Sequence, residues 1–411
     1  MSRTKTQLKH IISPAILSLY VLVLILGSLH PIVSWQWPAS SNWLLTFENE
    51  TRYTPSNDLI INFLIYIPLG VLIAQLFSVK FKSWQLFITT CLSLALLSLT
   101  IECLQLFIPS RAQSFVDFSM NTLGASCGAF FYLFLSKQNP LGIAVNQWRY
   151  TLFARGRFID LGLLVITMWS LAKLTPFIPA LSFEAINVDL ISLNTPINTV
   201  QQYLSTLGFA LEGFAIMSIT ALCLRHGHNT LIITLAFCLF IFTMRIPIYG
   251  INTSNEQFIG LILASLLFFA LKEQANKTYV VIAVYAIIFS YIISQLNLPL
   301  LLEEHKPKDF NWIPFYFQFN RITQIREILE TIWTASAICF LVLSLKPSNP
   351  RKTVMIGIVV IPIVSFLIEW QQQKLQLSSP DITNIIIATG VWVLPFFHPS
   401  IRKAQKSKPL P

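Results

Sequence analysis

Long apolar runs alternate with short polar connections along the whole chain, and this pattern predicts membrane-spanning helices. A helix needs about 20 apolar residues to cross the hydrocarbon core of a bilayer, and twelve runs approach that length. We therefore expect an all-α fold, a polytopic transmembrane helical bundle of about twelve spans. The predicted spans are residues 11–33, 58–79, 84–108, 116–136, 158–179, 201–224, 230–248, 255–271, 279–302, 326–345, 353–374 and 381–397.

The composition supports a membrane protein and argues against a soluble enzyme. Hydrophobic residues make up 54% of the chain and charged residues 11%, whereas soluble domains carry about 25% charged residues. The six cysteines lie inside apolar runs without a CxxC pair, which is typical of small buried side chains. His226 and His228 stand in a short connection without a carboxylate or cysteine beside them. We therefore expect no metal site and no cofactor.

The basic residues are distributed unevenly between the two sides of the predicted membrane. With the N-terminus in the cytoplasm, 19 of the 28 Lys and Arg residues lie in cytoplasmic segments, six lie in outer segments and three lie within spans. The positive-inside rule describes such a bias, so we expect both termini in the cytoplasm. The net charge of +10 does not indicate nucleic-acid binding, because the charges fall between the apolar runs.

The turn between the third and fourth predicted spans carries the richest polar chemistry. Glu102 and Gln105 share one helix face before the turn, and Asp117 and Asn121 share another after it. Arg111 lies in the turn itself. Because a helix rises 1.5 Å per residue, an antiparallel hairpin would bring all five groups together near the outer interface. They are our candidate ligand-binding site.

Two roles are open for this polar hairpin. An ionisable side chain within a span is costly and indicates a functional site, but the same groups could simply hold two helices together. Asp117 also stands at a helix start, where a carboxylate is favourable. Gly124 and Gly128 extend the face of Asp117 as a pair of small residues, which is typical of close helix packing. We favour a ligand site because five polar groups converge, and we assign no catalytic residue.

Part of this pattern returns 267 positions later. The segment Ile368-Glu369-Trp370-Gln371-Gln372 matches residues 101–105. The arginine, aspartate and asparagine that follow in the first copy are replaced by serine, asparagine and alanine in the second. We interpret this as an internal duplication in which the second polar site has decayed. The candidate degenerate site consists of Glu369, Gln372, Asp381 and Asn384.

These motifs resemble those of the VanZ-like family of bacterial membrane proteins. The resemblance rests on NDLIINFLIYIPLGVL at residues 57–72, and on E-x-x-Q, P-S-R and D-x-x-x-N-x-x-G within residues 102–124. A weaker copy near the C-terminus begins with the N-W-I-P-F of residues 311–315. The resemblance implies work in the bacterial cell envelope, since the family is named for a member that lowers susceptibility to the glycopeptide teicoplanin. It also implies the bacterial inner membrane as the location.

The resemblance and the repeat together suggest four parts. We expect residues 1–140 to form a VanZ-like four-helix unit, 141–275 a middle membrane unit, 276–400 a degenerate VanZ-like unit, and 401–411 a basic cytoplasmic tail.

Arg245, Lys173 and Glu212 are charged side chains of the middle unit that fall within predicted spans. Arg245 lies near the end of its helix, where we expect it to snorkel to the interface. Lys173 and Glu212 lie in neighbouring spans and could form an ion pair.

Three classes of function remain open. We favour a protein of envelope homeostasis or antibiotic tolerance that binds a phospholipid or lipid-linked glycan headgroup at the polar hairpin, where an arginine suits phosphate. The alternative is a transporter or flippase of an envelope lipid or glycan precursor, favoured by many spans and an internal repeat. A membrane glycan or lipid transferase ranks third, because we find no large outer loop to hold a sugar. The expected partners are membrane lipids, and we lean against an enzyme.

Overall fold

The computed structural model describes residues 14–29, 35–37, 56–109, 114–136, 139–175, 197–225, 227–246, 248, 254–271, 276–295, 309–314, 322–375 and 380–397. The chain divides into two compact units, a first unit of Met1–Arg149 and a second unit of Tyr150–Pro411. Within the described ranges the regular structure is α-helical, and β-structure is limited to isolated bridges. The all-α prediction is therefore confirmed.

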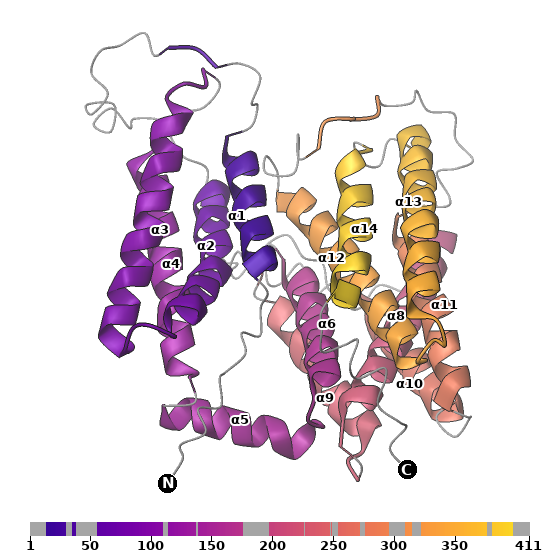
Figure 1. The fold of residues 1–411 in the computed structure, drawn as a ribbon. Helices are drawn as coiled ribbons and strands as arrows, with labels where there is room; N and C mark the ends of the chain where they lie inside the picture. The colour runs from indigo at the N-terminus through magenta and orange to yellow at the C-terminus, as the bar shows by residue number, and fades with distance from the viewer. Residues whose placement is uncertain are drawn as a thin grey trace. The chain divides into compact units, whose positions relative to one another are not determined.

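Each of the twelve predicted spans coincides with a helix (Figure 1). The first unit holds α1 (Pro14–Ser28), α2 (Ser56–Phe77), α3 (Ser83–Gln105), α4 (Phe115–Phe134) and most of α5 (Pro140–Leu152). The described helices of the second unit are α6 (Arg157–Leu174), α8 (Val200–Cys223), α9 (Thr230–Arg245), α10 (Asn255–Leu271), α11 (Asn276–Gln295), α12 (Ile322–Ser344), α13 (Pro350–Leu375) and α14 (Ile382–Phe397). The apolar pattern thus located the helices correctly.

Among the described helices, α5 is the one that the apolar pattern did not predict. It is 13 residues long, too short to register as a span in a stretch that we expected to be a polar connection. The Oδ1 atom of Asn139 accepts a hydrogen bond from the backbone N–H of Leu141 at 3.1 Å and caps the helix start. A Cβ atom on Gly142 would lie 2.0 Å from the carbonyl oxygen of Ser136, so α5 begins in close contact with the end of the preceding segment.

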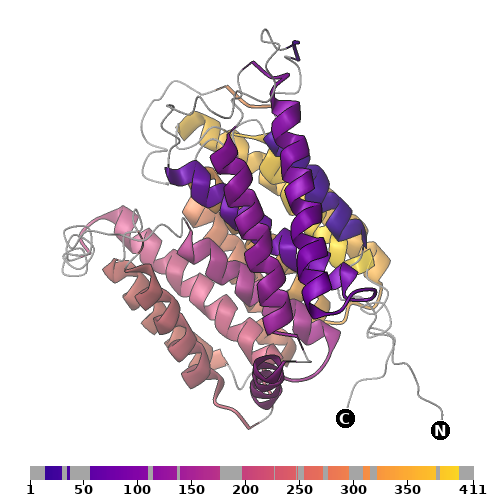
Figure 2. The same ribbon diagram turned by 90° about the vertical axis from the view of Figure 1, so that its left-hand side faces the viewer.

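Glycines allow α4 to approach α2 closely in the first unit, where α4 also packs on α3 (Figure 2). A Cβ atom on Gly124 would lie 2.1 Å from the carbonyl oxygen of Phe63, and one on Gly128 would lie 2.1 Å from that of Ile67. On the α2 side, Gly70 has an equally close backbone neighbour in α4. The predicted packing role of Gly124 and Gly128 is confirmed, and the partner helix is α2.

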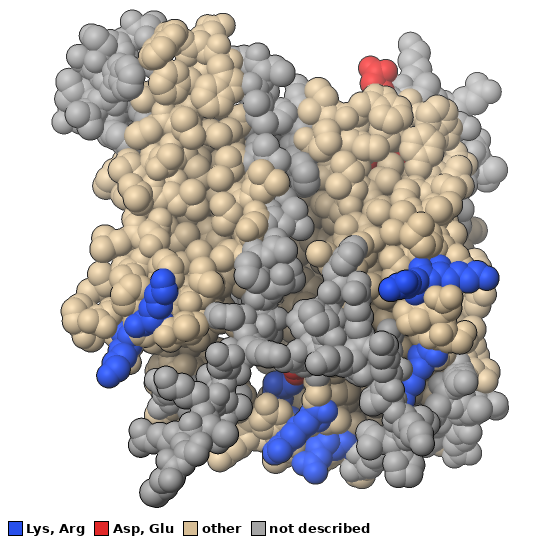
Figure 3. Space-filling model, in the orientation of Figure 1, with Lys and Arg blue, Asp and Glu red and all other residues tan. Residues whose placement is uncertain are grey.

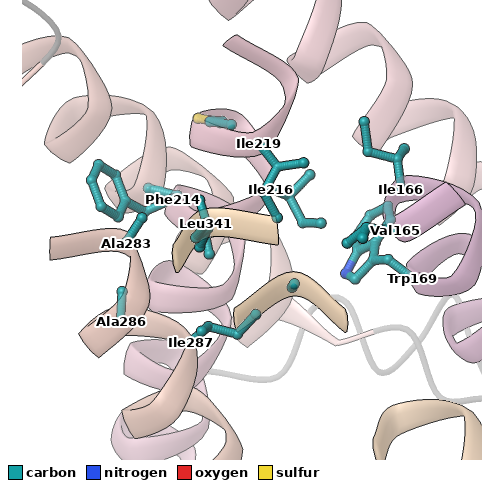
Figure 4. Close-up of a cluster of buried hydrophobic side chains, with 14 of the residues drawn as sticks. Val165, Ile166, Trp169, Phe214, Ile216, Ile219, Ala283, Ala286, Ile287 and Leu341 are labelled. Carbon is teal, nitrogen blue, oxygen red and sulfur yellow. The ribbon is translucent and has the colours of Figure 1, made fainter. Parts of the chain in front are cut away.

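The second unit has an apolar core around α8. Phe214, Ile216 and Ile219 of α8 are fully buried and lie among side chains of α6, α11 and α12 (Figure 4). The rings of Phe158 and Phe340 stack with their centroids 4.5 Å apart in the same region. In its most apolar window α8 is 72% buried, whereas α13 is 17% buried. α8 is therefore the central helix of this unit, and α13 lies at its surface.

The outer faces of the long helices are apolar, as lipid contact requires. Leu92 and Leu96 of α3 are 64% and 66% exposed, and Val359 and Ile363 of α13 are 57% and 54% exposed. On the face drawn in Figure 3, Lys and Arg side chains lie near the ends of helices and leave a broad uncharged zone. Among the described residues, six helices are long and apolar enough to cross a membrane, namely α2, α3, α8, α11, α12 and α13. The fold is that of a polytopic membrane protein, and the number of twelve spans stays a prediction.

Candidate functional site

The end of α3 is joined to the start of α4 through Glu102. Its Oε2 atom accepts a hydrogen bond from the backbone N–H of Ser114 at 3.0 Å. Ser114 is the N-cap of α4, and its hydroxyl oxygen accepts a hydrogen bond from the backbone N–H of Asp117 at 3.1 Å. The first N–H groups of a helix have no partner within the helix, and its positive end favours a carboxylate. Glu102, which is only 2% exposed, therefore stabilises the start of α4.

One turn deeper, Asn121 links α4 to α3. Its Nδ2 group donates a hydrogen bond to the hydroxyl oxygen of Ser98 at 3.0 Å, and both side chains are buried. The Oδ1 atom of Asn121 is buried without a hydrogen-bond partner among the described residues. The hydroxyl of Tyr66, from α2, lies against the side chain of Ser98 and near the carboxylate of Glu102. We call Tyr66, Ser98, Glu102 and Asn121 the Asn121 cluster.

The side chain of Gln105 contacts α1, a role that we did not expect for it. Its Nε2 group donates a hydrogen bond to the carbonyl oxygen of Ser28 at 2.8 Å. Ser28 is the last residue of α1, and the last carbonyls of a helix need partners outside the helix. The sequence placed Gln105 opposite Asp117 and Asn121, but its amide instead holds α1 against α3.

The five predicted residues of the hairpin differ in their positions and contacts. Arg111 lies outside the described residues, so its place above the hairpin stays a prediction. Asp117 lies in the first turn of α4 and is partly buried, on the same helix face as Asn121. Of the five, Glu102 and Asn121 are the two that the structure brings into one buried cluster.

Sequence reasoning missed Tyr66, Ser98 and Ser114. Ser98 stands four residues before Glu102 and seven before Gln105, so all three share one face of α3. That spacing was a usable signal. Tyr66 sits in the apolar run of α2, and only the packing of α2 on α4 reveals its place.

The second unit repeats two of these hydrogen bonds. The Oε2 atom of Glu369 accepts from the backbone N–H of Asp381 at 2.8 Å, across 12 residues as in the first unit. The Nε2 group of Gln372 donates to the carbonyl oxygen of Gln295 at 3.3 Å, across 77 residues as in the first unit. The Nδ2 group of Asn384 donates to Oε1 of Glu369 at 2.8 Å. Three of the four residues of the predicted degenerate site thus meet where α13 passes to α14, and Gln372 turns to α11.

Asp381 also forms a hydrogen bond to the segment that connects α11 to α12. Its Oδ2 atom accepts a hydrogen bond from Nδ2 of Asn311 at 2.7 Å. The backbone N–H of Asn311 donates to the carbonyl oxygen of Pro380 at 2.9 Å, and that of Ile382 donates to the carbonyl oxygen of Asn311 at 3.1 Å. These hydrogen bonds hold Asn311 against the start of α14.

A separate group of buried charges surrounds Lys173 of α6. Its Nζ atom lies 2.8 Å from Oε1 of Glu212, in α8, and 2.9 Å from Oε1 of Glu330, in α12. Glu212 also accepts a hydrogen bond from the indole N–H of Trp169, and Glu330 accepts one from that of Trp333. We call Lys173, Glu212 and Glu330 the Lys173 triad. The pairing of Lys173 with Glu212 is confirmed, and no sequence pattern indicated Glu330 as the third member.

Arg245 does not snorkel to an interface. It is 2% exposed, and its Nη1 atom donates a hydrogen bond to Oε1 of Gln257, in α10, at 2.9 Å. Our prediction was wrong because α10 packs against α9 there and buries the guanidinium beside an acceptor.

The histidine and cysteine residues of the described part of the chain lie apart from any cluster of metal-ligating side chains. There, no group of three or more His, Cys, Asp and Glu side chains is arranged to hold a metal ion. Nε2 of His228 lies 2.8 Å from the carbonyl oxygen of Thr151, whereas His226 lies outside the described residues.

The fold and the polar hairpin define a class: a polytopic α-helical membrane protein with buried polar groups between its third and fourth helices. Residues 14–136 match the model of the VanZ/LLP1 family, and this range contains α1 to α4 and the whole Asn121 cluster. The first unit therefore carries a VanZ-like domain, as the motifs indicated. Comparison with curated proteins gave no match, and neither did comparison with solved structures.

Proposed function

We propose that this VanZ-like membrane protein acts in the bacterial inner membrane, in envelope homeostasis or tolerance of envelope-targeting antibiotics such as teicoplanin. It does so by binding the polar headgroup of a phospholipid or lipid-linked glycan at the first unit. The observation that carries the proposal is the Asn121 cluster, where the buried amide oxygen of Asn121 has no hydrogen-bond partner among the described residues. Buried polar groups normally have hydrogen-bond partners, so a ligand hydroxyl that donates a hydrogen bond to the Oδ1 atom of Asn121 would satisfy it.

Comparison of the two polar hairpins separates residues that bind from residues that support the fold. The glutamate and glutamine make matching hydrogen bonds in both units, so we assign them to holding helices together. Asn121 and Asp117 correspond to Ala388 and Asn384 in the second unit. Residues that differ while the surrounding hydrogen bonds persist are the ones expected to select a ligand. This comparison also supports an internal repeat of a four-helix unit.

Asn121→Ala is the variant that tests the proposal. We expect it to weaken binding of a lipid-linked glycan up to about tenfold, because a glycan hydroxyl would donate to the Oδ1 atom of Asn121 and a hydrogen bond between neutral groups contributes about 0.5–1.5 kcal/mol, where 1.4 kcal/mol corresponds to tenfold. Alanine stands at the corresponding position of α14, so the helix should tolerate it. Native mass spectrometry of the purified protein measures bound lipid, and growth of bacteria that rely on the protein measures teicoplanin tolerance.

The matched control is Ser119→Ala in the same helix, since the Ser119 hydroxyl donates only to the carbonyl oxygen of Phe115, one turn away, at 2.7 Å. This control should keep both lipid binding and tolerance. If a stably folded Asn121→Ala protein binds the lipid and protects cells as well as wild type, the cluster serves packing alone and the proposal fails.

A second candidate function is transport of an envelope lipid or glycan precursor, and the Lys173 triad is the observation that favours it. Ionisable groups buried within membrane helices mark ion and substrate pathways in transporters. Movement of a fluorescent lipid between leaflets of proteoliposomes separates the two functions. Transport requires such movement, whereas the binding function predicts none.

A further inference from the structure

An open cavity lies in the second unit where α5 ends and α8 passes to α9. Its volume is about 730 Å³, and it is lined by Ala154, Arg155, Leu222, Leu224 and Arg225. Small-molecule sites have volumes of about 300–1,000 Å³, so a lipid headgroup fits within it. Neither arginine belongs to the polar hairpin or to the Lys173 triad.

The frame of this cavity is built by hydrogen bonds between two segments of the backbone. The N–H of Ala154 donates to the carbonyl oxygen of Cys223, and the N–H of Arg225 donates to that of Leu152, both at 2.9 Å. Phe153 and Leu224 form an isolated antiparallel bridge between the same segments. The cavity wall is therefore held by backbone contacts that do not depend on a ligand.

The same contacts fix the positions of the two arginines. The Nη1 atom of Arg225 donates a hydrogen bond to the carbonyl oxygen of Tyr150 at 2.9 Å, which caps the end of α5. The guanidinium of Arg155 lies over the ring of Tyr150, 4.8 Å from its centroid. Both arginines are exposed. Tyr150 thus positions both guanidinium groups in the lining of the cavity, one through its ring and the other through its backbone carbonyl. This arrangement suits an anion.

The chemistry of this lining favours a lipid phosphate. A guanidinium can donate two parallel hydrogen bonds to a phosphate, and basic pockets between transmembrane helices bind the headgroups of anionic lipids. Leu222 and Leu224 supply an apolar wall, which suits the glycerol and acyl part of a phospholipid better than a water-soluble phosphate ester. The cavity also lies at the end of α8, which is long and apolar enough to span the membrane.

We propose that this cavity binds the phosphate headgroup of an anionic phospholipid, with Arg155 and Arg225 as the two phosphate-binding residues. The site is independent of the Asn121 cluster, and its role is to anchor the α5 end and the α8–α9 connection at the membrane surface.

Arg155→Gln is the test variant, because Arg155 is exposed and its guanidinium stacks on Tyr150 without capping a helix. Arg351→Gln is the matched control, an exposed arginine at the start of α13. Native mass spectrometry of the full chain in detergent measures binding of dioleoyl phosphatidylglycerol and of the zwitterionic dioleoyl phosphatidylcholine. We expect wild type and Arg351→Gln to prefer phosphatidylglycerol equally, and Arg155→Gln to bind it about tenfold more weakly.

A lysine variant and a soluble competitor sharpen the outcome. Arg155→Lys keeps the charge but loses the paired donors, so its affinity for phosphatidylglycerol should fall between those of wild type and Arg155→Gln. Millimolar glycerol 3-phosphate should leave the lipid bound. Equal phosphatidylglycerol binding by Arg155→Gln and wild type, an equal loss in Arg351→Gln, equal binding of phosphatidylcholine, or displacement by glycerol 3-phosphate would each overturn the proposal.

Discussion

Lys173→Met should destabilise the protein by about 3–5 kcal/mol, the cost of leaving buried charges unpaired. Lys173 is 7% exposed, and the side chains of its partners Glu212 and Glu330 are 10% and 18% exposed. Methionine has a similar length but no charge, so both carboxylates would lose their cation within the second unit. Thermal unfolding of the purified protein in detergent measures the loss as a lower midpoint temperature.

The control for this prediction removes all three charges together. Lys173→Met combined with Glu212→Gln and Glu330→Gln leaves no unpaired charge, and neutral or apolar replacements of whole buried ion groups are often tolerated. We expect the triple variant to recover much of the lost stability. A single variant as stable as wild type, or a triple variant no better than the single one, would contradict an energetic coupling within the Lys173 triad.

Gly124→Ala should separate α4 from α2 and destabilise the first unit. The added Cβ atom would lie 2.1 Å from the carbonyl oxygen of Phe63, and a backbone atom of a packed helix cannot move aside as a flexible side chain can. Overpacking of this kind costs about 1–3 kcal/mol, which exceeds the gain of up to about 1 kcal/mol in helix propensity from glycine to alanine. The midpoint temperature of unfolding in detergent should fall.

Gly390→Ala is the matched control, because a Cβ atom on Gly390 of α14 meets no other atom within 4 Å. It should leave stability unchanged or raise it slightly through helix propensity. If Gly124→Ala and Gly390→Ala have the same effect, then α2 and α4 are not held by close backbone contact at Gly124.

The two polar hairpins show how far the sequence could predict the candidate site. The repeat of Glu102 and Gln105 at Glu369 and Gln372 was visible in the residue letters alone. The structural role of the glutamine could not be predicted from the repeat, because no local pattern shows that its side chain reaches a carbonyl 77 positions away. The sequence therefore assigned Gln105 to the hairpin, while the structure assigns it to the end of α1.

The same limit explains the other differences. Glu330 joins Lys173 across 157 residues, and no local spacing signals such a partner. Arg245 lies only 12 residues from Gln257, yet its burial depends on how α9 packs on α10. Helix α5 was not predicted because its 13 residues do not form an apolar run long enough to span a membrane.

The sequence by itself determined where twelve of the described helices lie, because the length and apolarity of a run decide locally whether it can form a membrane helix. It also determined the VanZ-like character of the first unit, since those motifs are read from neighbouring residues. Only the tertiary structure decided which buried polar groups meet. Hydrogen bonds such as that of Asn121 to Ser98 and ion pairs such as that of Lys173 to Glu330 form between separate helices, and the packing that aligns those helices has no local signal in the chain.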